Sequence, residues 1–160
     1  MKSASIADIK KELGRVPAKE LVEMCLRMAK YKKENKELLT FLLFDADDLP
    51  RYINAVKTFL DEEFAGLRYS NLYLVKKILR RILRLTHKHI KYTGSKPAEI
   101  ELLLYFCRKS AESGIPIGQS VQLANMYDQL LKKIRLAIEA QHEDLQYDYR
   151  RELAAVIQAF

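Results

Sequence analysis

The residues with the clearest chemical potential are nine lysines and arginines between Phe64 and Pro97, a segment without a single acidic residue. They are Arg68, Lys76, Lys77, Arg80, Arg81, Arg84, Lys88, Lys91 and Lys96. The whole chain carries a formal net charge of +7, so the other residues together sum to −2. Charge concentrated on one element attracts anions, whereas scattered charge mainly gives solubility, so this segment is the first candidate site.

The cations from Lys76 to Lys91 gather on one side when the segment is drawn as a helix. At about 100° per residue they fall within an arc of roughly 140°, and apolar residues occupy the opposite half. The apolar residues are Val75, Ile78, Leu79, Ile82, Leu83, Leu85 and Ile90. The pattern predicts a helix whose apolar side packs in the core and whose cationic side faces outward. The predicted anion-binding or nucleic-acid-binding residues are Arg68, Lys76, Lys77, Arg80, Arg81, Arg84, Lys88 and Lys91.

Like charges four residues apart destabilise a helix, and no acid on this segment offsets them, so we expect a compensating anion elsewhere. One source is the phosphate of RNA or DNA, with Tyr69 and Tyr92 near the rim for occasional base stacking. A second is an acidic protein or an anionic membrane surface. A third is the protein's own acids, in which case the face is neutralised internally: Asp45, Asp47 and Asp48, the run 61–63, or the stretch 139–148. Because arginine binds phosphate bidentately, nucleic acid is the first choice among the external partners.

The three histidines offer no metal site by their spacing. Glu139 and His142 form a Glu-x-x-His pair, but a di-iron bundle needs a second such motif, and none occurs. His87 and His89 point about 200° apart on a helix, so they do not chelate jointly. We expect His89 to be a core histidine with a backbone partner, and we expect no metal and no cofactor.

One enzymatic alternative remains. Arg-x(4–6)-His in an all-α chain resembles the motif of HEPN-type ribonucleases, in which the pair acts on RNA phosphodiesters. Arg81 with His87 and Arg84 with His89 fit that spacing. Of the arginine–histidine pairs, Arg80 and His87 lie closest together on one face of the helix. The resemblance implies a ribonuclease with Arg80, Arg81 and His87 as its catalytic candidates. No phosphate-binding glycine loop occurs, and no serine or cysteine nucleophile has a recognisable base, so the main expectation is a non-catalytic binding or scaffold protein.

The elements that must position these residues are delimited by glycines and prolines, and no segment alternates with the period of a strand. The sequence therefore predicts an all-α protein of seven or eight helices, either an irregular bundle or a short superhelix similar to HEAT repeats. The expected helices are 5–13, 17–33, 35–44, 50–64, 70–93, 97–113 and 120–160, the last broken near 141–144. The helix at 35–44 is apolar over most of its surface, so we expect it to lie at the centre.

A chain of 160 residues has the size of one domain, so we expect a single all-helical domain over 1–160. The longest uncharged apolar stretch, 38–44, is too short to span a bilayer, and the first residues lack the apolar region of a secretory signal. Cys25 and Cys107 are expected to be buried free thiols, which together with the missing signal favours the cytoplasm. A structural role is the competing expectation, with a projecting C-terminal helix at 144–160 that mediates a homodimer.

Overall fold

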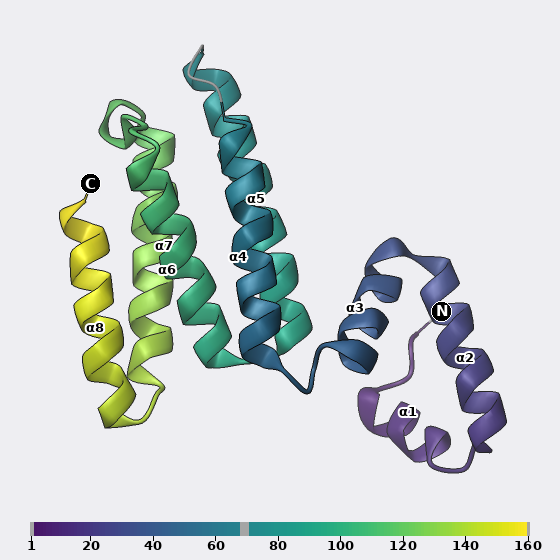
Figure 1. Ribbon diagram of the computed structural model, residues 1–160. Coiled ribbons are helices and arrows are strands. Elements are labelled where there is room, and N and C mark those ends of the chain that lie inside the picture. The colour runs from purple at the N-terminus through teal and green to yellow at the C-terminus, as the bar shows by residue number, and fades with distance from the viewer. Residues whose placement is uncertain (1, 68–70, 160) are drawn as a thin grey trace. The chain divides into compact units, whose positions relative to one another are not determined.

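The computed structural model describes residues 2–67 and 71–159, and within these ranges the chain is helical without any strand (Figure 1). Its helices are α1 (Ile6–Leu13), α2 (Ala18–Tyr31), α3 (Lys33–Phe44), α4 (Leu49–Ala65), α5 (Leu72–Thr93), α6 (Lys96–Glu112), α7 (Val121–Glu139) and α8 (Glu143–Gln158), with a 3₁₀ helix at Ile117–Gln119. The expected all-α class is therefore confirmed.

Local sequence explains where these helices begin and end. Side-chain oxygens of residues such as Ser5, Asp48 and Ser95 accept backbone N–H groups of the first turn, which otherwise have no partner. Gly94 closes α5 with a φ of 58°, a left-handed conformation that glycine adopts without steric cost. The expected break in the C-terminal segment is confirmed, because α7 ends at Glu139 and α8 begins at Glu143.

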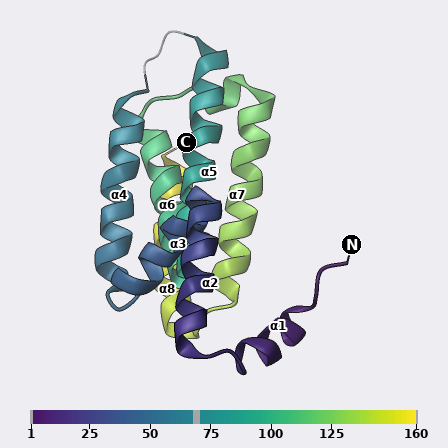
Figure 2. The same cartoon turned by 90° about the vertical axis from the view of Figure 1, so that its right-hand side faces the viewer.

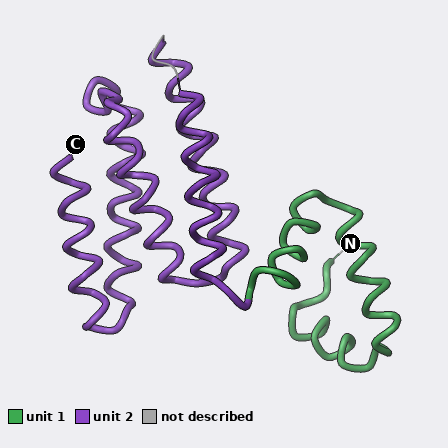
Figure 3. Tube along the Cα trace, in the orientation of Figure 1, with its two compact units in different colours: residues 1–46 green, residues 47–160 purple. Residues whose placement is uncertain are grey.

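The chain divides into two compact units, residues 1–46 and residues 47–160 (Figure 3). Unit 1 contains α1, α2 and α3, and its main internal packing is that of α2 against α3. Unit 2 contains α4 to α8, which run in alternating directions (Figures 1 and 2). The single domain over 1–160 stays a prediction.

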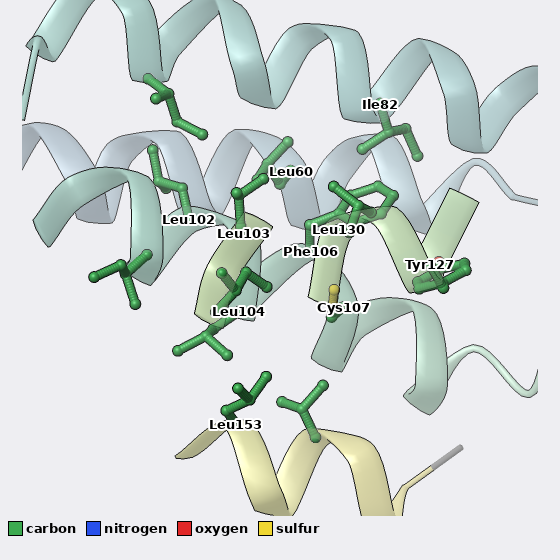
Figure 4. Close-up of a cluster of buried hydrophobic side chains, with 14 of the residues drawn as sticks. Leu60, Ile82, Leu102, Leu103, Leu104, Phe106, Cys107, Tyr127, Leu130 and Leu153 are labelled. Atoms are coloured by element: carbon green, nitrogen blue, oxygen red, sulfur yellow. The ribbon is translucent and has the colours of Figure 1, made fainter. Parts of the chain in front are cut away.

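Helix α6 is the centre of unit 2, since α4, α5, α7 and α8 all pack against it. Its buried side chains occupy most, but not all, of the helix circumference, which is the pattern expected of a largely enclosed helix. They are Ala98, Glu99, Ile100, Leu102, Leu103, Leu104, Phe106, Cys107 and Ser110. In the close-up of the core, Leu102, Leu103 and Leu104 on successive positions of α6 lie amid side chains from the surrounding helices (Figure 4). Phe106 is fully buried, with its ring against those of Phe64 on α4 and Tyr127 on α7.

Two expectations about burial are wrong. The expected central helix, α3, buries only Phe41, and the central position belongs to α6. Cys25 is exposed, whereas Cys107 is buried as expected, and both are free thiols. The sequence could not distinguish α3 from α6, because both are apolar around most of their circumference.

Helix α8 packs along α6 and α7 and buries Leu153 and Val156, so within unit 2 it does not project. None of the helices in the described part of the chain is both long enough and apolar enough to cross a bilayer.

The packing around α6 predicts that Phe106→Ala lowers the free energy of unfolding of unit 2 by about 3–5 kcal/mol, because the truncation leaves a cavity between three helices. Urea unfolding measures the loss. The control is Leu136→Ala on the exposed side of α7, which should change stability by no more than about 0.5 kcal/mol. Similar losses in the two variants would contradict the central role of α6.

Candidate nucleic-acid interface

Helix α5 is fixed in rotation by a buried stripe that recurs at every third or fourth residue. The stripe consists of Val75, Leu79, Ile82, Thr86 and Ile90. It packs against α4 and α6, which leaves the opposite side of the helix to solvent. The cations of the expected arc therefore lie on the outer side of α5, where Lys76 and Lys88 are half-buried and the others are exposed.

Five of these cations line one groove on the surface of unit 2. The groove is a hollow of about 530 Å³ that is formed mainly by the first half of α5, with one residue from the start of α7. Its lining residues are Tyr73, Lys76, Lys77, Ile78, Arg80, Arg81, Arg84 and Gln122. The Lys76 Nζ donates a hydrogen bond to the Gln122 Oε1 at 3.4 Å, which joins the two helices across the groove. We call this hollow the basic groove.

The acids of the protein neutralise only part of the basic groove. Arg81 forms an ion pair with Glu63 of α4. No carboxylate among the described residues forms an ion pair with Lys76, Lys77, Arg80 or Arg84. Four of the five groove cations thus keep their charge available to an external anion.

Two of the acids that could have neutralised the face, Asp61 and Asp48, have partners elsewhere. Asp61 on α4 accepts hydrogen bonds from the Tyr105 Oη at 2.7 Å and the Lys109 Nζ at 3.0 Å, both on α6. Burial acts to raise the pKa of this carboxyl, but those two donors outweigh it and hold the pKa below its usual value. Asp48 accepts the backbone N–H of Arg51 as the cap of α4.

The remaining predicted site residues do not join the groove. Lys88 and Lys91 lie further along α5 and do not line it. Arg68 and Tyr69 lie outside the described residues. Tyr92, expected near the rim, instead packs its ring edge-on against His89. Tyr73 is the aromatic residue of the groove. It was not among the predicted site residues, although it precedes Lys76 by one helical turn.

Buried Glu99 organises a second charged cluster beside α5. Its carboxylate accepts from the Lys96 Nζ at 2.8 Å and the Lys133 Nζ at 2.9 Å. Burial acts to raise the pKa of Glu99, but the hydrogen bonds and charges of the two lysines outweigh it, so the pKa is lowered. Lys96 of the basic run is therefore neutralised.

His87 belongs to this Glu99 cluster and not to the basic groove. Burial and the charge of Lys133 lower the pKa of His87, and the opposing charge of Glu99 does not reverse the effect. The imidazole is consequently neutral at pH 7. On the continuous helix α5, Arg80 precedes His87 by about 10 Å along the axis, so the ribonuclease candidates occupy two different surroundings.

His89 lies on the other side of α5, where it packs against α4. Its Nδ1 is 2.8 Å from the Tyr52 Oη, and its ring also contacts that of Phe59. The described residues contain no cluster of three or more histidine, cysteine or acidic side chains that could hold a metal ion.

Comparison of the chain with protein-family models, curated proteins and solved structures finds no match. The class of protein that the fold and the groove define is therefore a helical protein with a basic surface groove.

The Glu99 cluster predicts a stability difference that depends on pH. A carboxyl with a lowered pKa stabilises the fold above its unfolded pKa and loses that effect as the pH falls through its folded pKa. We expect Glu99→Gln to cost about 1–3 kcal/mol at neutral pH, because it breaks buried hydrogen bonds to charged partners. The difference from the parent protein should shrink as the pH falls below about 4.

Urea unfolding of both proteins at neutral and acidic pH measures this effect. Glu62→Gln serves as the control, since Glu62 is an exposed carboxylate on α4 and its replacement should change little at either pH. A Glu99→Gln deficit that is the same at both pH values would contradict the assignment.

Proposed function

We propose that this protein is a non-catalytic nucleic-acid-binding protein that holds the phosphate backbone of RNA or DNA in the basic groove. The observation that carries the proposal is the groove itself, where five cations converge. Among the described residues, Arg81 alone of the five has a carboxylate partner.

A polyanion suits this arrangement better than a single small anion. From Lys76 to Arg84 the cations extend about 12 Å along the axis of α5, which is longer than one phosphate group. Neutralising several phosphates releases condensed counterions, and this release supplies most of the affinity of non-specific nucleic-acid binding. Arg80 and Arg84 add bidentate geometry that matches phosphate oxygens.

The groove also contains an aromatic side chain that suits an unpaired base. Tyr73 is 69% exposed and lies beside Lys76 and Lys77. Stacking on an aromatic ring is possible for every base, so it supports binding without sequence preference. We therefore expect single strands to bind more tightly than duplexes.

The alternatives have less support from the contacts. An anionic membrane surface would require a broad exposed apolar face beside the cations. The apolar stripe of α5 that includes Val75, Leu79 and Ile82 is fully buried, which leaves isolated residues such as Tyr73 and Leu74 exposed. An acidic protein surface remains the alternative external partner. Two free cysteines suit a reducing compartment, so we propose the cytoplasm as the location.

Reversing the charge of groove cations that have no carboxylate partner among the described residues tests the proposal. Lys77→Glu, Arg80→Glu and Arg84→Glu together should weaken binding of a labelled single strand of about 20 nucleotides by at least about tenfold. The slope of log affinity against log salt, near −0.7 per phosphate contact for single strands, should become shallower by about 2. Fluorescence anisotropy between about 50 and 200 mM salt measures both quantities, with RNA, DNA and duplex probes in separate arms.

The matched control replaces three exposed arginines outside the groove with glutamate. They are Arg135, Arg150 and Arg151. Both variants have the same net charge, so the control should keep most of the affinity if the groove is the site. Equal losses in the two variants, or a salt response that is flat in the parent protein, would contradict the proposal. Cleavage of the RNA probe by the parent protein that is lost in His87→Ala would instead support the ribonuclease alternative.

Glu63, the carboxylate that pairs with Arg81, offers a separate test of the groove. Glu63→Gln removes the carboxylate that competes with phosphate for this guanidinium, so affinity for the single strand should rise about threefold or more. The control is Glu62→Gln on the same helix, which removes one negative charge without an ion pair to Arg81. A rise of equal size in both variants would show a general charge effect and contradict the specific role of Glu63.

A further inference from the structure

Unit 1 leaves an unusual amount of apolar side chain exposed for a folded segment. Within residues 2–46 only Phe41, with 5% of its surface exposed, belongs to the buried class. At the end of α3, Leu43 is 63% exposed and Phe44 is 71% exposed. A helix that is apolar on most sides is normally enclosed by other elements, as α6 is in unit 2.

The exposed apolar residues of α2 and α3 form a groove. The hollow between the two helices measures about 640 Å³. Its apolar floor includes Leu26 of α2 together with Leu39 and Leu43 of α3. We call it the α2–α3 groove, and all of its lining lies within unit 1.

A rim of lysines lies at one end of this apolar floor. Lys30, Lys32, Lys33 and Lys36 line the groove from the end of α2 and the start of α3. Of these four lysines, only Lys33 has an ion-pair partner among the described residues, the i,i+4 contact with half-buried Glu37 at 3.7 Å. Lys33 itself is exposed, and a long i,i+4 pair contributes little stability, so the rim remains available to acidic groups.

We propose that the α2–α3 groove binds an acidic amphipathic helix of a partner protein. Two helices side by side form the cradle that a third helix fills, with its apolar residues at i, i+3, i+4 and i+7 seated on the floor. Aspartates or glutamates beside that apolar stripe then pair with the lysine rim. The apolar floor supplies affinity, and the rim selects an acidic partner over a basic one.

Charge favours an acidic helix over a second copy of this chain as the partner of the α2–α3 groove. A symmetric dimer through the α2–α3 groove would bring the lysine rims of both copies into one interface, and among the residues described in unit 1 no carboxylate lines the groove to pair with them. An anionic membrane matches the charge, but it offers a flat interface and not a ridge that fills a hollow between helices. The acidic helix satisfies both the shape and the charge.

The proposal concerns unit 1 and is independent of nucleic-acid binding by unit 2. The test uses the full chain and a fluorescent synthetic helix of about 18 residues with leucines at the four anchor positions and glutamates beside them. A second peptide carries lysine in place of every glutamate, and a third carries serine in place of every leucine. We expect only the acidic leucine peptide to bind, at least about tenfold more tightly than the other two.

Variants then locate the site. Leu43→Ser with Phe44→Ser should weaken binding of the acidic peptide at least tenfold, and because both residues are already exposed, the fold should persist. Met24→Ser on α2, which is exposed outside the groove, is the apolar control. Lys32→Glu with Lys36→Glu should reverse the preference toward the basic peptide, whereas Lys10→Glu with Lys11→Glu on α1 should not.

Several outcomes would overturn the proposal. Equal binding of the acidic and basic peptides would mean that the rim selects nothing. Binding of phosphatidylserine vesicles that Leu43→Ser with Phe44→Ser abolishes, without binding of the acidic peptide, would identify a membrane surface. A dimer by light scattering that the same two substitutions dissociate would identify a second copy. Absence of peptide binding at any salt concentration would remove the acidic helix as the occupant.

Discussion

The enclosure of α6 by four other helices is the constraint on which the structure of unit 2 depends. A helix whose apolar side chains occupy most of its circumference is stable in water only when neighbours cover those sides. Each neighbour of α6 must therefore turn its own apolar stripe inward, and the side left over faces solvent. On α5 that remaining side consists of cations, so the packing of the core determines where the charge lies.

Because the orientation of α5 is fixed by fully buried residues, the basic groove is a rigid feature of the surface. Rotating the helix to hide its cations would expose Val75, Leu79 and Ile82, at a cost of several kcal/mol. The acids of α4 illustrate the same point, because the side of the helix on which each carboxylate lies decides its partner. Asp61 meets α6, whereas Glu63 meets Arg81.

Much of the fold could be predicted from the sequence, because glycines, prolines and capping residues mark helix ends through local physics. The cationic side of α5 was likewise visible in the spacing of its residues. The identity of the central helix was not, because α3 and α6 have the same apolar character and only tertiary packing separates them. Gln122 was beyond the sequence, since it reaches the groove from another helix. Glu63 lies in the acidic run 61–63 that the sequence offered as an internal partner, but only the packing of α4 against α5 shows that it pairs with Arg81. Tyr73 did leave a signal, one helical turn before Lys76.

The pairing of Arg81 with Glu63 has a consequence for how strongly any anion must compete. A side chain held beside its partner by a packed helix acts as a ligand with an effective concentration in the millimolar range or above. A lone phosphate or chloride ion must displace that tethered carboxylate from free solution. A chain of phosphates needs to do so only after its other groups are already bound. The carboxylate thus sets a threshold that favours multivalent anions over the small ions that surround every protein.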